Sequence, residues 1–587
     1  MEEKKEVTST AIWRLYEKGT DYINRIKLVT KSDKFHRMYI GDQWYGLESG
    51  GESMPMFNFI EGTVKYKVAT VAQNSMSAVY TPIGKHDEAS IQACEALNTN
   101  FSIMWERAKM DKHAWDVIRD GAIVGDGYIY FGGGDVSQTQ IIDNVNVLLS
   151  DEQEQNIQEQ KYILLVERRM VSDIRKEARE NGIPEDEIGL IQRDEDTSNQ
   201  LGNREELTYS DEEDGKCTSV LYMYKDEEGF VHFAKSVKNV IYQPDKKIVA
   251  TDQLGQETST GLTMYPIVNF IWKNKKGSAR GCGDVEFLVP NQIELNKTLA
   301  RRALAIKQCA YPKLAYMENA ISNPDSLDLI GAKIGVKYGE TQKINDIITY
   351  LNPTVVSPDA KSFTDELLQG SKDLAGAGDA ALGQVDPTQA SGAAIIASRD
   401  QAALPLNEQV ARYKQFVEDI AVLWYDIWKA YNPNGLVVTT TDDAGQEQEE
   451  VIPAEVLDQM MVSVRIDVSQ NNPYSKYAQE QAIMNLFQMN AISFEEMVQA
   501  LDDDAVAPKG KLQDIIDKRG EQNKMQDTLA QALEQLKQSQ AVIAQLQNQS
   551  GDNAQAKQEL INALGQIKQQ QEIINRMGGQ ANEMQSM

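Results

Sequence analysis

Residues 264–316 constrain the fold of this chain more than any other stretch. The apolar run from Pro266 to Trp272 is rich in β-branched and aromatic residues, which is typical of a buried strand. A basic loop follows, and its glycines at 277, 281 and 283 let it turn sharply. Asp284 stands where a helix N-cap belongs, and Pro290 suits the first turn of a second, longer helix. The pattern predicts a strand, a tight loop and a long helix, which Tyr311-Pro312 ends.

Length and composition indicate a soluble protein of several domains. A chain of 587 residues is too long for one core, so two to four domains are expected. We find no apolar run long enough to span a bilayer, and the charged N-terminal segment MEEKKEVTST is not a secretory signal. The four cysteines form no CxxC pair and are interpreted as reduced cytosolic thiols.

The net charge of −29 argues against a protein that grips nucleic acid nonspecifically, because such binders carry surplus Lys and Arg. Acidic charge gives solubility, and an acidic surface also repels the phosphates of nucleic acid. Both interpretations stay open.

Motifs for chemistry are missing from the sequence. The segment Gly331 to Lys337 lacks the glycine spacing and final Ser or Thr of a phosphate-binding loop, and we find no HExxH or GxSxG motif. The four histidines are far apart, and the acidic run Asp211 to Gly215 lacks the ligand pattern of a calcium loop. We therefore predict no catalytic residue, no cofactor and no metal site. The number of acidic residues alone is compatible with a two-metal nuclease, but no compact acidic motif stands at a strand end, where such a site is expected.

Hydrophobic patterns outside residues 264–316 predict a chain that alternates helical and β-rich regions. Helices are expected at residues 8–28, 58–79, 87–120 and 171–181, a helix end followed by a strand at 121–131, strands at 161–168, 218–224, 230–240, 436–441 and 462–468, and a polar loop at 185–214. The strands at 436–441 and 462–468 are expected to pair with each other around an acidic linker. A long helix is predicted from Ser391 to Tyr431, bent at Pro405.

The C-terminal segment from Glu521 is rich in Gln, with leucines spaced by three and four residues. Gln540 and Gln571 fall at seam positions, so a coiled coil would be weak alone. Either it forms when copies are brought together, or the segment is a disordered tail.

Several of these segments together resemble the portal (head-to-tail connector) proteins of tailed double-stranded-DNA bacteriophages. The resemblance covers roughly residues 30–520 in the order of elements. The residues that carry it are Tyr39, Gly41, Asp42, Gln43 and Trp44; Pro266, Phe270, Gly281, Gly283, Asp284, Pro290, Gln292, Asn296 and Lys297; and Ser391, Gly392, Ala394 and Ile395. The Gln-rich tail lies outside it.

The resemblance implies an α+β portal fold with a mixed α/β wing, a two-helix stem, a small α/β clip, a long kinked helix and an α-helical crown with a helical or disordered tail. The implied boundaries are 1–283 for the N-terminal region and wing, 284–310 and 357–374 for the stem helices, 311–356 for the clip, 375–390 for a tunnel loop, 391–472 for the kinked helix and the return to the wing, 473–520 for the crown, and 521–587 for the tail.

The function implied by the resemblance is structural. Subunits would form a ring of about twelve copies at one capsid vertex, through which DNA is packaged and ejected. Implied partners are further copies, double-stranded DNA, the large terminase ATPase, major capsid and scaffold proteins, and tail adaptor proteins, without a membrane. The protein would be made in the host bacterial cytoplasm and end in the virion. The alternatives are another head-tail connector or capsid protein, or a DNA-processing enzyme.

Two sets of residues follow from this interpretation. The expected fold anchors are Trp44, Gly283, Asp284, Pro290, Gln292, Asn296 and Pro405, and the candidates for contact with DNA in the channel are Lys297, Arg301, Arg302, Lys307, Gln384, Asp386 and Gln389. The cations of the first stem helix have two open roles. They could pair with acidic residues of the second stem helix, where exposed pairs add only about 0–1 kcal/mol each, or Arg301 or Arg302 could contact phosphates.

Overall fold

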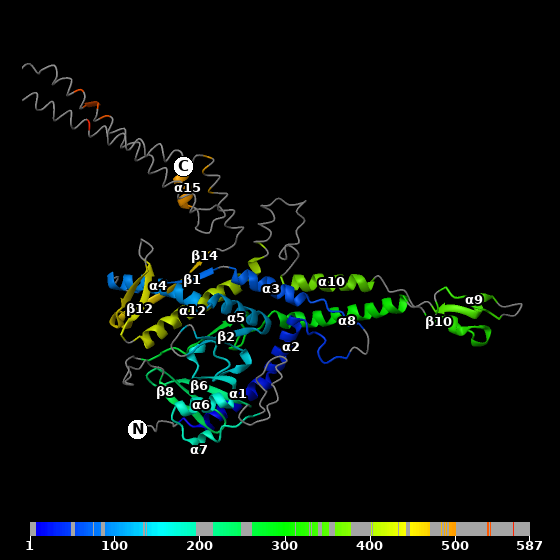
Figure 1. Ribbon diagram of the computed structural model, residues 1–587, viewed down its shortest axis with the longest axis horizontal. Helices are drawn as coiled ribbons and strands as arrows, with labels where there is room; N and C mark the ends of the chain where they lie inside the picture. Colours follow the sequence, from blue (N-terminus) through cyan, green and yellow to red (C-terminus); the bar gives the residue numbers. More distant parts are fainter. Residues whose placement is uncertain are drawn as a thin grey trace, which may run out of the picture. The chain divides into compact units, whose positions relative to one another are not determined.

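The protein is built from helices and small antiparallel sheets, as Figure 1 shows, which confirms the predicted α+β class. This computed structural model divides into two units, residues 1–469 and residues 470–587. It describes residues 7–48, 53–73, 75–83, 88–132, 136, 138–194, 215–247, 261–310, 313–327, 329, 331–337, 343–351, 359–376, 401, 403–432, 434–441, 447–469 and 492–500, with single residues at 483, 487, 489, 534, 537, 538, 541 and 568.

Three helices open the first unit. Helix α1 spans Ser9–Arg25 and α2 spans Leu28–Ile40, and they are separated at Lys27, whose φ of 56° is left-handed. The helix predicted at 58–79 is too long, because α3 (Phe59–Ala72) is followed by strand β1 (Ser75–Pro82). The β-branched and aromatic residues of β1 favour a strand once a distant partner is available.

The next helices lead into a central sheet. The helical region predicted at 87–120 is two helices, α4 (Glu88–Arg107) and α5 (Met110–Val124), divided at Lys109 with a φ of 52°. Strand β2 (Asp126–Phe131) follows as expected and lies between β3 (Thr139–Ile142) and β9 (Ile267–Ile271).

A five-stranded antiparallel sheet fills much of the region between residues 147 and 247. Its strands, in spatial order, are β4 (Val147–Leu149), β5 (Tyr162–Met170), β6 (Lys216–Lys225), β7 (Val231–Ser236) and β8 (Ile241–Lys247). Alternate residues of β5 face opposite ways, since Leu164 packs against α1 whereas Leu165 joins the main core. Helix α6 (Val171–Glu180) and the short α7 (Glu185–Ile188) form a separate apolar cluster with the end of the sheet, and 3-10 turns lie at Asn144–Asn146 and Ile157–Glu159.

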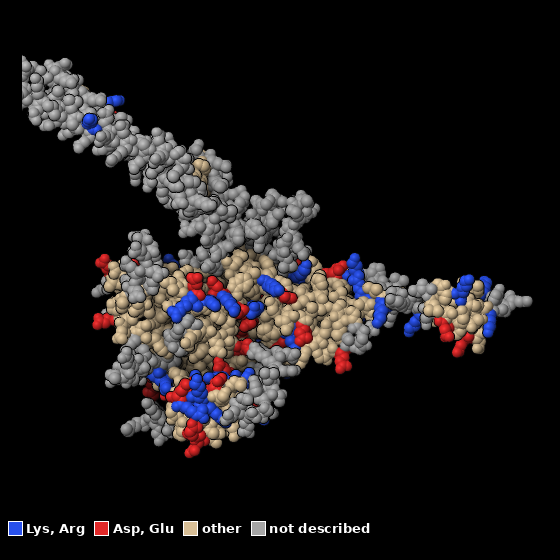
Figure 2. Space-filling model, in the orientation of Figure 1, with Lys and Arg blue, Asp and Glu red and all other residues tan. Residues whose placement is uncertain are grey.

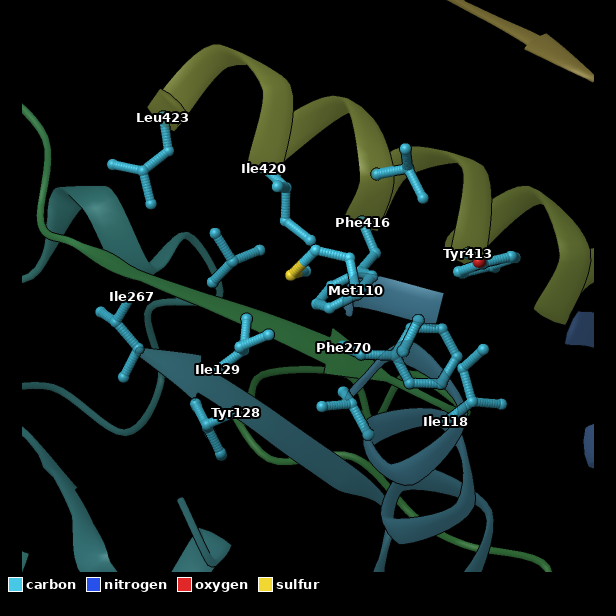
Figure 3. Close-up of a cluster of buried hydrophobic side chains, with 14 of the residues drawn as sticks. Met110, Ile118, Tyr128, Ile129, Ile267, Phe270, Tyr413, Phe416, Ile420 and Leu423 are labelled. Atoms are coloured by element: carbon cyan, nitrogen blue, oxygen red, sulfur yellow. The ribbon is translucent and has the colours of Figure 1, made fainter. Parts of the chain in front are cut away.

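The main core lies between helix α12 (Asn407–Tyr431) and the β3-β2-β9 sheet. Figure 3 shows Phe416 and Ile420 of α12 pointing toward the strands below, where Phe270 and Ile129 lie. The rings of Phe270 and Phe416 meet edge to face with centroids 5.8 Å apart. Pro405 lies in a 3-10 turn, Leu404–Leu406, directly before α12, and residues 391–400 of the predicted long helix lie outside the described residues.

The strand pairing predicted after α12 is wrong. Strand β12 (Leu436–Thr441) pairs with β13 (Glu447–Ile452), which begins inside the segment expected to be an acidic linker, residues 442–450. Strand β14 (Val462–Ser469), which follows helix α13 (Ala454–Gln459), pairs instead with β1 in the register Ser75↔Ser469 to Pro82↔Val462. A local hairpin closes at little entropic cost, and this outweighs the low β-propensity of the glutamates in β13.

Two helices and a small segment between them occupy residues 285–374. Helix α8 (Val285–Ala310) packs against α10 (Asp359–Leu374). Between them lie β10 (Lys313–Tyr316), 3-10 turns at Glu318–Ala320 and Pro324–Ser326, α9 (Ile344–Ile347) and β11 (Ile348–Leu351), and β10 pairs with β11. Pro290 does not begin a new helix but lies inside α8. It is exposed, so the Glu286 carbonyl that loses its donor lies on the side of the helix that water can reach.

The second unit contains the short helix α15 (Phe494–Ala500) within the predicted crown. Ser493 caps it, because the Glu496 backbone N–H donates to the Ser493 Oγ at 3.2 Å and the Ser493 N–H donates to the Glu496 carboxylate at 2.8 Å. Nearly all of the predicted crown and tail lies outside the described residues.

Glycines bring the start of α8 into backbone contact with the end of α5. A Cβ on Gly281 would lie 2.3 Å from the Gly125 carbonyl oxygen, and one on Gly283 would lie 2.4 Å from the Ile123 carbonyl oxygen. Gly125 itself has a φ of 119°, which disfavours other residues. The glycine-rich loop before α8 and the glycine that follows α5 therefore form a single contact.

We predict that Gly281→Ala lowers the free energy of unfolding by about 2 kcal/mol or more, because the new methyl group meets a backbone atom that cannot rotate away. Thermal unfolding followed by circular dichroism, at equal protein concentrations, measures this. The matched control is Gly370→Ala in α10, where nothing lies within 4 Å and the gain in helix propensity should raise the melting temperature slightly. An unchanged melting temperature for Gly281→Ala would contradict the close approach.

Candidate functional site: the α8–α10 hairpin and its seat

Helix α8 is buried at its start and exposed beyond. Its buried side chains are Val285, Leu288, Val289, Gln292, Leu295 and Asn296, which recur every three or four residues along one face. Two of the six are amides, which explains why apolar positions alone suggest no narrow stripe. Between Lys297 and Ala310 none of the side chains that the structure describes is buried.

An ion cluster fixes the first turn of α8. The Asp284 carboxylate, with a side chain 5% exposed, accepts a bond from Lys67 Nζ of α3 at 2.7 Å and a second from Lys273 Nζ, just after β9. Asp284 was expected as an N-cap, but within the described residues its side chain binds these two lysines and no backbone N–H of α8. The cluster joins three elements that are far apart in the sequence.

Burial shifts the pKa of the carboxylate in this cluster upward and the pKa of the buried lysine downward, because it disfavours the charged form of each. Burial favours the neutral carboxyl of Asp284, but the two lysines more than offset this effect, so the pKa of Asp284 lies below its usual value. Burial also lowers the pKa of Lys67, and this outweighs the attraction of Asp284. Lys67 is thus a desolvated cation, and the buried carboxylate of Asp284 favours its charged form.

A chain of buried amides holds the next turns of α8 to the connection between α2 and α3. Asn296 Nδ2 donates to Gln43 Oε1 at 2.5 Å, and Gln292 Nε2 donates to Asn296 Oδ1 at 3.0 Å. Gln292 also binds the backbone on both sides of Asn58, donating to the Phe57 carbonyl at 2.8 Å and accepting from the Phe59 N–H at 3.2 Å. Gln43 donates to the Asn58 side chain at 3.0 Å. We call Gln43, Asn58, Lys67, Lys273, Asp284, Gln292 and Asn296 the seat of α8.

A buried arginine ties down the loop before α8. Arg280 is 5% exposed and forms a two-bond ion pair with Glu152, with both distances 2.9 Å. It also donates to the carbonyls of Asn144 and Val147 at 2.7 and 2.5 Å. Two cations of the loop, Lys273 and Arg280, are therefore used inside the molecule.

The second helix of the hairpin is held by apolar and polar contacts. Ile293 and Leu299 of α8 and Leu367 and Leu368 of α10 all pack against the main core. Asn291 Nδ2 donates to the Ser371 hydroxyl at 3.0 Å, and that hydroxyl donates to the Leu367 carbonyl. These contacts lie near the base of the hairpin.

The predicted channel residues fall into two groups. Lys297, Arg301, Arg302 and Lys307 all lie on α8, whereas Gln384, Asp386 and Gln389 lie outside the described residues. Arg301 is exposed and pairs with Glu294 of its own helix at 3.3 Å. Among the residues that the structure describes, no ion pair joins Lys297, Arg301 or Arg302 to an acid of α10. The expected pairing across the hairpin is therefore not seen for these three residues within one subunit.

The predicted anchors have mixed outcomes. Gly283, Asp284, Gln292 and Asn296 are buried around the start of α8 as expected of anchors. Trp44 was expected to be the buried anchor of its motif, but it is only partly buried and its indole N–H donates to the Pro55 carbonyl at 3.3 Å. The neighbouring Gln43 is the buried residue. Sequence reasoning missed Asn58, Lys67 and Arg280, since polar residues are expected on surfaces unless a partner is known.

No group of three His, Cys, Asp or Glu among the described residues could hold a metal ion. In the part of the chain that the structure describes, no helix is long and apolar enough to cross a membrane.

The geometry defines a class of structural protein, in which an anchored helical hairpin extends from an α+β body. The family model described as phage P22-like portal protein matches residues 27–571. The chain belongs to this family and is a phage portal protein, a structural component of the virion.

Two further comparisons complete this result. No curated protein matches the chain. A chain of the solved structure titled "Virion of native gene transfer agent (GTA) particle" is similar with a TM-score of 0.36 and 9% identity, over 80% of this chain and 93% of that one. We draw nothing from a likeness at this TM-score.

We predict that Asp284→Asn lowers the free energy of unfolding at neutral pH by about 3–5 kcal/mol, because Lys67 stays buried without its counter-ion. The folded pKa of Asp284 lies below the unfolded value, so its contribution is present above about pH 4 and is lost as the pH falls through the folded pKa. Urea unfolding of both proteins across this range measures the difference.

The control for this prediction is Asp116→Asn, which breaks a more exposed pair with Arg119 on α5 and should change stability little. A difference between wild type and Asp284→Asn that stays constant as the pH falls below 4 would contradict the assignment.

Proposed function

We propose that copies of this chain assemble into a closed ring of about twelve subunits at one vertex of the capsid, and that DNA enters and leaves through its central channel. Membership of the portal family over residues 27–571 supports this proposal, and the anchored α8–α10 hairpin carries it. A hairpin fixed only at its base can line a channel while the body of the subunit forms the ring around it.

Exposed apolar side chains on the hairpin support assembly with neighbours. In α8 they include Leu304 and Ile306, and in α10 they include Phe363 and Leu374. A single subunit leaves these side chains in water, at a cost that burial against another subunit would remove. Neighbouring hairpins in a ring supply such a surface.

The regions of the chain would take the following roles. Residues 1–283 form the N-terminal region and wing, 284–310 and 357–374 the stem, 311–356 the clip, 375–390 a tunnel loop, 391–472 the kinked helix and the return to the wing, 473–520 the crown, and 521–587 a helical or disordered tail. Helices α8 and α10 and the small β10–β11 sheet support the stem and clip assignments.

Contact with DNA is assigned to the stem and tunnel loop. Lys297, Arg301, Arg302 and Lys307 supply local cations on a chain whose net charge is −29, and Gln384, Asp386 and Gln389 would supply the loop. A largely acidic wall with few cations lets a duplex slide without being held. The alternative role for the cations, ion pairing with acids of a neighbouring hairpin, stays open.

The remaining partners follow from the same proposal. In this proposal the chain performs no catalysis, and a separate large terminase ATPase docks on the clip and drives the DNA. Tail adaptor proteins would replace it after packaging, and major capsid and scaffold proteins would surround the wing.

Electron microscopy of the purified full-length chain, with native mass spectrometry, tests the proposal. We expect closed rings of about twelve copies with a central channel wide enough for a DNA duplex. Rings without a channel, a compact dimer, or a monomer that persists at high concentration would contradict it.

A further inference from the structure

Two asparagines of this chain are followed directly by glycine, and they lie in different surroundings. The pairs are Asn181-Gly182, at the end of α6, and Asn434-Gly435, between α12 and β12. Asparagine is chemically labile before glycine, because glycine has no side chain to keep its backbone nitrogen away from the asparagine side chain. The sequence alone gives both pairs the same reactivity.

The backbones of the two pairs are alike. Gly182 and Gly435 both have a positive φ, 76° and 102°. Each glycine N–H donates to the carbonyl three residues before it, Gly182 to Arg179 at 3.0 Å and Gly435 to Asn432 at 3.1 Å. The attacking nitrogen is therefore held in the same way in both pairs, and we expect a difference in reactivity to come from the asparagine side chains.

Those side chains are held differently. Asn181 is half-buried, its Nδ2 donates to the Tyr242 carbonyl at 3.1 Å, and its Oδ1 accepts from Lys246 Nζ at 3.5 Å. The Asn434 side chain is exposed and forms no hydrogen bond within the described residues. Attack on the side-chain carbon of Asn181 requires the amide to give up its bonds, whereas the amide of Asn434 is free to rotate toward the glycine nitrogen.

The fold requires the glycine of the exposed pair. A Cβ on Gly435 would lie 2.5 Å from the Ile452 carbonyl oxygen, whereas a Cβ on Gly182 would meet nothing within 4 Å. The contact with Ile452 stands at the base of the β12–β13 hairpin, where Leu436 pairs with Ile452. The reactive pair is thus part of the backbone geometry that starts this hairpin.

We propose that Asn434 is a site of spontaneous deamidation. The Gly435 nitrogen attacks the side-chain carbonyl carbon of Asn434 and forms a C–N bond, which closes a five-membered ring. The side-chain nitrogen takes up the proton of Gly435 and leaves as ammonia. Water then opens the ring at either of its two carbonyl groups, and the product is aspartate or isoaspartate.

Both products change the base of the hairpin. Each adds a negative charge, and Figure 2 shows acidic side chains at the end of the body where α4 and β12 lie, so the new charge meets like charges. Isoaspartate also adds one carbon to the main chain directly before Gly435, whose contact with Ile452 leaves little room for a shift. We therefore expect the modified chain to pair β12 with β13 less firmly.

Peptide mapping by mass spectrometry tests the assignment on the purified full-length chain, kept folded at mildly alkaline pH for several weeks. We expect aspartate and isoaspartate to accumulate at Asn434 about tenfold or more faster than at Asn181, since one hydrogen bond that must first break is worth about tenfold in rate. Asn432 is the blank control, because the nitrogen of Pro433 carries no proton. The reaction is intramolecular, so the result does not depend on the proposed ring.

The same measurement in urea separates the effect of the fold from that of the sequence. Both Asn–Gly pairs should then react at similar rates, because the bonds of Asn181 are lost. The variant Asn434→Gln, whose longer side chain would have to close a six-membered ring, should stay unmodified over the same period. After storage, hydrogen exchange of residues 436–452 should become faster in wild type and stay unchanged in this variant.

Two results would overturn the site: equal rates at Asn434 and Asn181 in the folded chain, or an Asn434 that stays intact in the folded chain while it reacts in urea. The loosening of the hairpin would be overturned if storage changes hydrogen exchange in wild type no more than in Asn434→Gln.

Discussion

The desolvated carboxylate of Asp284 fixes where helix α8, the proposed first stem helix of this portal protein, begins. A buried carboxylate requires partners, and here Lys67 of α3 and Lys273 after β9 supply them. Gly281 and Gly283 allow the chain to come close enough for that geometry, since a side chain at Gly283 would strike the last turn of α5 and one at Gly281 would strike Gly125 just after it. The ion cluster and the glycine contact therefore depend on one another.

The two parts of α8 are held by different means. Up to Asn296 the helix is held by its own subunit through amides and charges that leave little freedom in register. Beyond Lys297 its described side chains are exposed or half-buried, and exposed apolar residues take the place of buried polar ones. This division shows that the base of α8 is fixed within the subunit, whereas its outer part has few contacts within the described residues. Among the described residues of 313–351, the large apolar side chains of only Ile321 and Ile347 are buried, so this segment continues the same trend.

The order of the elements around α8 could be predicted from the sequence alone, because glycines, prolines and periodic apolar residues act locally. The family could be predicted from the same residues. The sequence predicted β9, the glycine-rich loop and the extent of α8 to within a few residues. It failed where the partner is distant. The pairing of β1 with β14 and the bond between Gln43 and Asn296 have no local pattern.

Burial of polar residues was the hardest feature to predict. Trp44 was predicted to be the buried anchor of its motif because large aromatic residues are usually buried. The adjacent Gln43 is buried instead, because its side chain bonds with the amide of Asn296 on α8. The same limit applies to Lys67, whose burial depends on a carboxylate more than two hundred positions away. Contact with DNA remains a prediction for all seven channel candidates: Lys297, Arg301, Arg302, Lys307, Gln384, Asp386 and Gln389.

Cross-linking inside DNA-filled particles tests most directly whether the stem borders the DNA path. A single cysteine would replace Lys297, Arg301, Arg302 or Lys307 in turn, with Cys309→Ser as background, and would carry a photoreactive group. Ile103→Cys on the exposed side of α4 is the reference position. The account predicts that at least one of the four stem positions links to packaged DNA well above the reference. Links at or below the reference level from all four positions would contradict a DNA channel lined by α8.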